Sequence, residues 1–152
     1  MPVIRHEIFI DAPIDVCFDL ARNVEVHTET TSNTKERAVA GVTAGLLEKG
    51  DTVTWEAIHF GVKQRLTAKI IEMKKPTAFT DVMIKGAFHS FTHVHEFIES
   101  GTGTIMKDSF SYQSPFGMLG VMADRLFLEK YMRNFIGNRA KELKRIAENE
   151  AE

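Results

Sequence analysis

The feature of this sequence that most constrains its fold is a long amphipathic segment near the C-terminal end. Beyond Gln113-Ser114-Pro115, apolar residues recur at spacings of three and four, which predicts one helix from about 117 to 149. Such a helix has one apolar stripe, and it must bury that stripe against another layer of structure. The stripe consists of Leu119, Met122, Leu126, Leu128, Met132, Phe135, Ile136, Leu143 and Ile146.

The rest of the chain reads mainly as strands. Residues 3–10 are β-branched and aromatic and predict a strand, followed by short helices at about 14–21 and 23–30. We expect Asp11 to cap the first helix, which Pro13 opens. Short turns, among them Gly61 and residues 100–103, join the later strands into an antiparallel meander whose one apolar face the long helix covers. The later strand segments are 35–41, 52–60, 62–73, 78–84, 87–99 and 102–112.

Length and composition indicate one α+β domain over residues 1–152, because the 152-residue chain has no repeat, linker or low-complexity tract. Its hydrophobic fraction of 43% and charged fraction of 26% are ordinary for a globular protein. Eleven Phe and seven Met are less ordinary. These residue types suit the irregular apolar wall of a ligand cavity, although a plain core also uses them.

Charge and cysteine content exclude several classes of protein. A net charge of −2 argues against a nucleic-acid partner, since binding phosphates needs a concentrated excess of Lys and Arg. The single Cys17 excludes an internal disulfide and a multi-cysteine metal site, and we expect it to be a small buried hydrophobe. With no signal-peptide pattern and no membrane span, the sequence favours a cytoplasmic protein. The C-terminal basic residues are interspersed with glutamates and predict a solvated helix face: Arg133, Arg139, Lys141, Lys144 and Arg145.

Alternation along the strands assigns the side chains that face inward, because successive residues of a strand point to opposite faces. The segment 78–84 fits either face, and we assign Phe79, Asp81 and Met83 to the inner one. Val62 and His89 fall on the inner face by the same alternation. The predicted ligand-binding residues are inward positions of the other strands, together with Met122 of the long helix. They are Trp55, His59, Gln64, Leu66, Phe91, His93, His95, Met106, Asp108, Phe110, Tyr112 and Met122.

Six of these inward positions are polar in an otherwise apolar wall. Burying a polar group without a partner costs on the order of 1–3 kcal/mol, so each needs a protein partner or the polar end of a ligand. A few convergent polar groups in an apolar cavity are typical of small-molecule sites. The six are His59, Gln64, His93, His95, Asp108 and Tyr112.

Local motifs add a family resemblance that covers the whole chain. The motifs are Asp11-Ala12-Pro13, Val16-Cys17-Phe18, Gly86-Ala87-Phe88, Phe91-x-His93-x-His95-x-Phe97, Thr104-x-Met106-x-Asp108 and Tyr112-x-x-Pro115-x-Gly117. With them the chain resembles the START-like (SRPBCC) superfamily, and more narrowly a bacterial ligand-binding branch often labelled cyclase/dehydrase-like. The resemblance implies the helix-grip fold, in which a curved seven-stranded antiparallel sheet wraps round the C-terminal helix over an apolar cavity. It implies no particular reaction, since members of this fold bind, carry or convert different molecules.

His93, His95 and Asp108 are the candidate catalytic residues. The two histidines share one face of a strand, and Asp108 faces the same way from the next strand. The group could hold a metal with His59 or Asp108 as third ligand, or act as an acid–base pair, or form a satisfied polar cluster beside a binding cavity. We favour the polar cluster and therefore expect neither a metal nor a cofactor.

The functional hypothesis is a binding or carrier protein for a small hydrophobic ligand with one polar end, a monomer or weak homodimer. An alternative is a polyketide cyclase/dehydratase-type enzyme in which an inward histidine is the general base. A third hypothesis is an interaction module whose cavity is only a core defect. The apolar loop 42–47 is either a gate or a surface turn that closes over the core.

Overall fold

The computed structural model describes residues 2–114 and 127–150. A short 3-10 turn at Ser32–Thr34 stands between the second helix and the second strand. In chain order the helices and strands are β1 (Val3–Ile10), α1 (Ile14–Ala21), α2 (Val24–Thr30), β2 (Arg37–Gly41), β3 (Thr52–His59), β4 (Val62–Lys74), β5 (Ala78–Lys85), β6 (Ser90–Ser100), β7 (Gly103–Gln113) and α4 (Glu129–Glu150).

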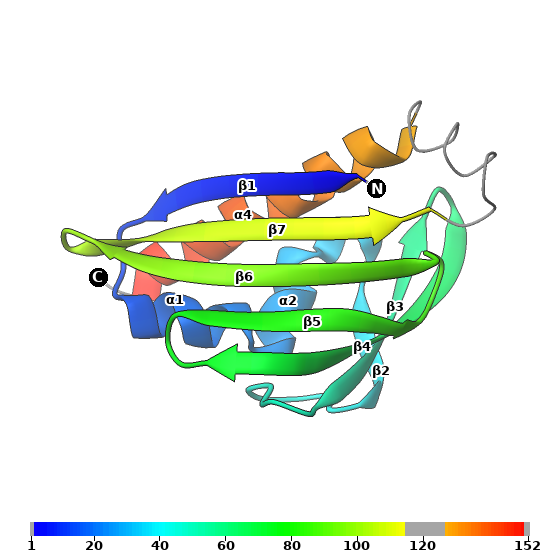
Figure 1. Cartoon of the computed structure of the whole chain (residues 1–152), viewed down its shortest axis with the longest axis horizontal. Helices are drawn as coiled ribbons and strands as arrows, with labels where there is room; N and C mark the ends of the chain where they lie inside the picture. The colour runs from blue at the N-terminus through cyan, green and yellow to red at the C-terminus, as the bar shows by residue number, and fades with distance from the viewer. Residues whose placement is uncertain (1, 115–126, 151–152) are drawn as a thin grey trace.

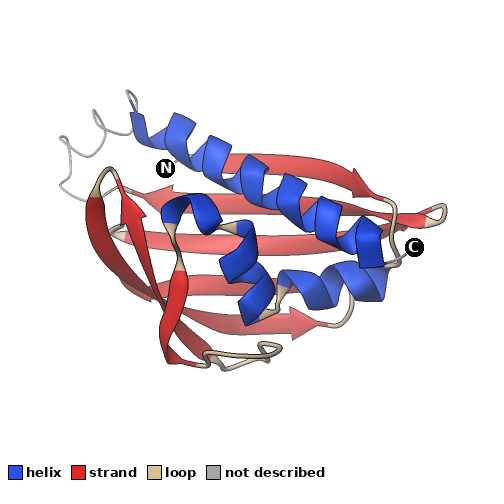
Figure 2. Ribbon diagram, turned by 180° about the vertical axis from the view of Figure 1, so that it is seen from behind, coloured by secondary structure: helices blue, strands red, loops and turns tan. Residues whose placement is uncertain are grey.

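The seven strands form one antiparallel sheet in the order β1-β7-β6-β5-β4-β3-β2. This confirms the predicted α+β helix-grip fold. Consecutive strands pair from β2 to β7, and β1 joins the far edge beside β7, with Val3 opposite Ser111 and Ile10 opposite Thr104. The sheet curves, and α1, α2 and α4 all lie on its inner face (Figures 1 and 2).

Two predicted hairpin turns are confirmed, one at Gly61 and one at residues 100–103, where Ser100 pairs with Gly103. His59 pairs with Val62, so Phe60 and Gly61 form a two-residue turn in which both φ angles are positive, 53° and 75°. Two positive φ angles match the twist of the flanking strands, as in a type I′ turn, and glycine adopts them without strain whereas phenylalanine does not. The chain therefore holds an aromatic side chain, 65% exposed, at the tip of this hairpin.

The core at one end of the sheet is built round α1. Phe18 is 1% exposed and makes edge-to-face contacts with Phe79 and Phe97, with ring centroids 5.6 and 5.5 Å apart. Cys17 beside it is fully buried, as expected. Helix α4 contributes buried residues at spacings of three and four, which is the pattern that predicted it: Met132, Ile136, Ala140, Leu143 and Ala147.

Several local predictions are wrong or lie outside the described residues. Asp11 does not cap α1: the N-cap position is Pro13, without a side-chain hydrogen bond, and the Asp11 backbone N–H instead donates to the Glu148 carboxylate at 2.9 Å. Val62 and His89 are exposed, because both stand where the strand gives way to a turn. The predicted helix start at 117 lies outside the described residues. Among the described helices, none combines the length and apolarity that crossing a bilayer requires.

Replacing Phe18 by Ala tests the contribution of this core. We expect Phe18→Ala to lower the free energy of unfolding by about 3–5 kcal/mol, through lost burial and the cavity left behind. Phe9→Ala is the matched control. Because Phe9 is 46% exposed, this substitution should lower the free energy of unfolding far less. Urea denaturation of both variants measures the difference, and equal losses would contradict this account of the core.

Candidate functional site

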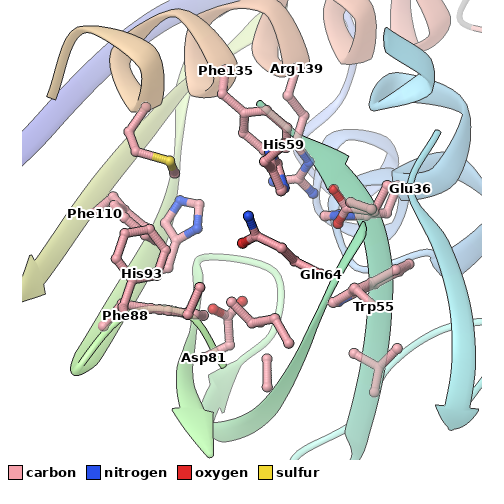
Figure 3. A pocket seen from close by; sticks show the side chains of 18 of the residues that line it. Glu36, Trp55, His59, Gln64, Asp81, Phe88, His93, Phe110, Phe135 and Arg139 are labelled. Atoms are coloured by element: carbon pink, nitrogen blue, oxygen red, sulfur yellow. The ribbon is translucent and has the colours of Figure 1, made fainter. Parts of the chain in front are cut away.

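A cavity of about 900 Å³ lies between the inner face of the sheet and the helices (Figure 3). Small-molecule sites typically enclose about 300–1,000 Å³ within mainly apolar walls. Strands β3 to β6 supply the largest share of the wall, α4 closes one side, and apolar side chains predominate. These include Leu47, Val53, Trp55, Leu66, Phe79, Phe91, Phe110, Met132 and Phe135.

The structure brings most of the predicted ligand-binding residues to this cavity, but not all. Met106 and Asp108 instead line an adjoining cavity of about 70 Å³ beneath α4, which shares His93 and His95 with the large one. Tyr112 is fully buried among aromatic rings and does not line either cavity, and Met122 lies outside the described residues. Those that line the large cavity are Trp55, His59, Gln64, Leu66, Phe91, His93, His95 and Phe110.

The three strands β5, β6 and β7 assemble a buried chain of imidazoles and carboxylates. In the sheet register Asp81 stands opposite His93, and His95 stands opposite Asp108. The Asp108 carboxylate lies 2.9 Å from His93 Nε2 and 3.3 Å from His95 Nδ1. Nε2 of His95 lies 3.2 Å from the Asp81 carboxylate. His95 therefore bridges two carboxylates, and Asp108 holds both imidazole rings.

Opposing effects set the charges in this chain of groups. Burial alone would raise the pKa of Asp108, but hydrogen bonds from His93 and His95 outweigh it and hold that pKa far below its usual range. Burial would lower the pKa of His95, but the two carboxylates raise it above its ordinary value. The pKa of His93 is lowered, first by burial and then by the neighbouring His95. These shifts favour an ionised Asp108, a protonated His95 and a neutral His93.

The metal hypothesis can be examined on the same group. Asp81, His93 and His95 could hold a metal ion, because one ligand atom from each lies within 4.8 Å of the others. The sequence suggested His59 or Asp108 as the third ligand. His59 is hydrogen-bonded to Tyr131 instead, and the Asp108 carboxylate is bonded to ring nitrogens of both His93 and His95. Carboxylates occupy both ring nitrogens of His95, so a metal would have to replace the proton between His95 and Asp81.

A second polar pair, which the sequence pattern did not indicate, lines the cavity from the helical side. His27 of α2 lies 2.6 Å from the Glu36 carboxylate, and its ring stacks on Trp55 with centroids 4.0 Å apart. Burial lowers the pKa of His27 despite the nearby carboxylate. A seven-residue helix has too few turns for its inward face to be read from periodicity, which is why this pair was missed.

Aromatic residues of the β3–β4 hairpin and of α4 meet beside the cavity. Nδ1 of His59 lies 2.5 Å from the Tyr131 hydroxyl. The Phe60 ring packs against the Tyr131 ring, with their centroids 4.5 Å apart. Phe60 and Phe127 both line the cavity and are 65% and 66% exposed. These contacts identify the cavity mouth between the hairpin tip and the first turn of α4.

The loop 42–47 is held to the junction of α1 and α2. The Leu47 backbone N–H donates to the Arg22 carbonyl at 2.9 Å, and the Arg22 guanidinium donates back to the Leu47 carbonyl at 3.0 Å. The Gly45 N–H donates to the Glu25 carboxylate. With Leu47 buried against the cavity, these bonds favour a surface turn closing over the core rather than a gate.

Arg139 is the main correction to the predicted site. The sequence placed it on a solvated helix face, but it is partly buried and lines both cavities. Figure 3 shows its side chain extending from α4 into the pocket. The signal was present in the spacing, because Arg139 follows Met132 by seven residues and Phe135 by four, which places all three on one helix face.

One family model matches the chain over residues 10–137, and its description is polyketide cyclase / dehydrase and lipid transport. A comparison with proteins of curated function found no match.

Solved structures share the fold at low sequence identity. A Thermus thermophilus protein, TTHA0849, is 20% identical, with a TM-score of 0.81 over 99% of this chain and 100% of that one. The major latex-like protein 151 of Panax ginseng is 13% identical, with a TM-score of 0.71 over 96% and 97%. The di-domain ARO/CYC StfQ from the steffimycin biosynthetic pathway is 11% identical, with a TM-score of 0.77 over 98% of this chain and 52% of that one. At these identities the likeness establishes the fold alone.

The lowered pKa of Asp108 predicts a specific acid response of stability. The pKa of Asp108 is lower in the folded protein than in the unfolded chain, where it has its ordinary value near 3.8. The ionised carboxylate therefore stabilises the fold fully above about pH 4, and this contribution is lost as the pH falls further. We expect the stability difference between the wild type and Asp108→Asn to shrink by up to about 1.4 kcal/mol per pH unit below about pH 4. Urea denaturation of both proteins from pH 2.5 to 7 measures it. Parallel profiles would show that Asp108 titrates normally.

Proposed function

The chain belongs to the polyketide cyclase/dehydrase and lipid transport family, within the START-like superfamily, and on that premise we propose that it binds or carries a small hydrophobic ligand with one polar end. The observation that supports this best is the cavity of about 900 Å³. It is too large to be a packing defect, since empty spaces in a close-packed interior rarely exceed a water molecule. Its size therefore argues against an interaction module with a mere core defect.

The distribution of side chains supports a ligand with two unlike ends. The apolar body would lie against the apolar side chains of Trp55, Leu66, Phe91 and Phe110. The polar end would meet the groups that reach the cavity from β5, β6 and the helices. Because the carboxylates that line the cavities are paired with histidines already, the protein does not need the ligand in order to satisfy them.

One arrangement favours catalysis as a second candidate function. His93 lines the cavity, its lowered pKa keeps it neutral near pH 7, and the Asp108 carboxylate lies 2.9 Å from its Nε2. A neutral imidazole oriented by a carboxylate is equipped to accept a proton from a bound substrate. A cyclase or dehydratase-type reaction on an enolisable substrate would use His93 in this way.

We further propose a cytoplasmic monomer or weak homodimer without a nucleic-acid partner. The one cysteine, Cys17, is free and buried, as is usual in reducing compartments. The net charge of −2 supports the absence of a phosphate-binding surface.

Native mass spectrometry of gently purified protein, compared with the denatured chain, tests the carrier proposal. We expect an additional mass of a few hundred daltons that is lost on denaturation, because an apolar cavity of this size retains an amphiphilic guest through washing. A bare chain mass that persists after incubation with a panel of fatty acids, sterols and aromatic polyketides would count against it. An increment of metal size would revive the site at Asp81, His93 and His95.

His93→Ala separates the two candidate functions. In a binding protein the variant should lose about 1–3 kcal/mol of ligand affinity, the cost of one stranded polar contact. In an enzyme it should abolish turnover while most of the binding is kept. His89→Ala is the matched control, since His89 is exposed just before the same strand. Calorimetric titration and a product assay with the ligand recovered from the native protein provide the two readouts.

A further inference from the structure

The Arg139 guanidinium is an incompletely bonded cation beside an apolar cavity. Its Nη2 donates to the Ala21 carbonyl at 3.2 Å, and its Nε is buried with no hydrogen-bond partner among the described residues. A guanidinium remains protonated at any physiological pH and has five N–H donors, so it cannot escape the cost of burial by losing its charge. The walls around it are mainly apolar, and the carboxylates among the lining residues are paired with histidines.

The carboxylates that reach the cavities are occupied by histidines rather than by Arg139. Glu36 pairs with His27 at 2.6 Å, Asp108 with His93 at 2.9 Å, and Asp81 with His95 at 3.2 Å. Within residues 2–114 and 127–150, Arg139 forms no ion pair with any carboxylate. The positive charge is therefore available to a molecule that enters the cavity.

Arg22 provides an internal comparison, because it also lines the cavity and is buried. All three nitrogens of its guanidinium are bonded, to the Asp19 and Glu48 carboxylates at 2.8 and 2.6 Å and to the Leu47 carbonyl. The fold therefore neutralises one cavity arginine with its own acidic residues, whereas the described part of the chain offers Arg139 no such partner. The difference indicates that Arg139 serves something other than the stability of the fold.

We propose that Arg139 binds the anionic end of the ligand and that the ligand is a hydrophobic monocarboxylate. A carboxylate can accept two parallel N–H bonds from one guanidinium, and Arg139 keeps further N–H donors beyond its bond to the Ala21 carbonyl. Protonation of His95, whose pKa the Asp81 and Asp108 carboxylates raise, reduces the repulsion of the entering anion by these two groups. The apolar chain or ring system of the ligand would extend from Arg139 toward Trp55 and Phe79. This inference rests on the proposed binding function and specifies its ligand.

Dodecanoate and dodecan-1-ol form a matched pair of probes, since they differ only at the polar end. Displacement of the neutral fluorophore N-phenyl-1-naphthylamine, at probe concentrations below micelle formation, measures both affinities. We expect the wild type to bind dodecanoate about tenfold or more tightly than dodecan-1-ol, as for a charge-assisted bidentate contact. Arg139→Met should abolish this preference by weakening dodecanoate alone, and Arg139→Lys should restore part of it.

Arg133→Met is the matched control, because Arg133 lies on the same helix but is exposed and paired with Glu129. It should leave both affinities unchanged. Equal binding of acid and alcohol by the wild type would overturn the inference, as would an equal loss of both probes in Arg139→Met. In either case the binding function would stand. If neither probe nor the fluorophore binds, the binding function itself fails. If Arg139→Met does not fold, the wild-type ratio of acid to alcohol decides the question.

Discussion

The packing of α4 against the sheet is the interaction on which the rest of the structure depends. Its buried face lies over β1 and the neighbouring β7, and the small cavity lies beneath the helix. A single straight helix cannot also cover a sheet that curves away through β5, β4 and β3 (Figure 2). The large cavity is the space between the curved strands and the helices α2 and α4, so cavity and fold have the same geometric origin.

The buried histidines and carboxylates are placed where that packing leaves the interior open. Such groups are costly in a dry core unless each has a partner, and a well-packed apolar core would be as stable without them. Here each carboxylate meets an imidazole across neighbouring strands or between helix and turn, so the group tolerates burial without a ligand. Their concentration along one cavity is more informative about function than any one of them, because a fold of this kind does not require them.

The alternation of side chains along the strands predicted much of the arrangement around the buried histidines. It put His93 and His95 on the inner face with Asp108 opposite, and the ladder of β6 and β7 brought them within hydrogen-bond distance. It did not show that α4 would separate Met106 and Asp108 from the large cavity, because that depends on where a helix crosses the sheet. Arg139 was misassigned for a related reason: a charge among glutamates looks solvated until the direction of its helix face is known.

The sequence by itself determined the order of strands and helices, the turns, and which strand residues point inward, since these follow from periods of two and 3.6 and from local backbone preferences. Only the tertiary structure decided the size of the cavity, the pairing of His27 with Glu36, and the position of Arg139 in the cavity wall. Those features depend on distances between segments far apart in the chain, and no local pattern encodes the curvature and crossing angles that fix such distances.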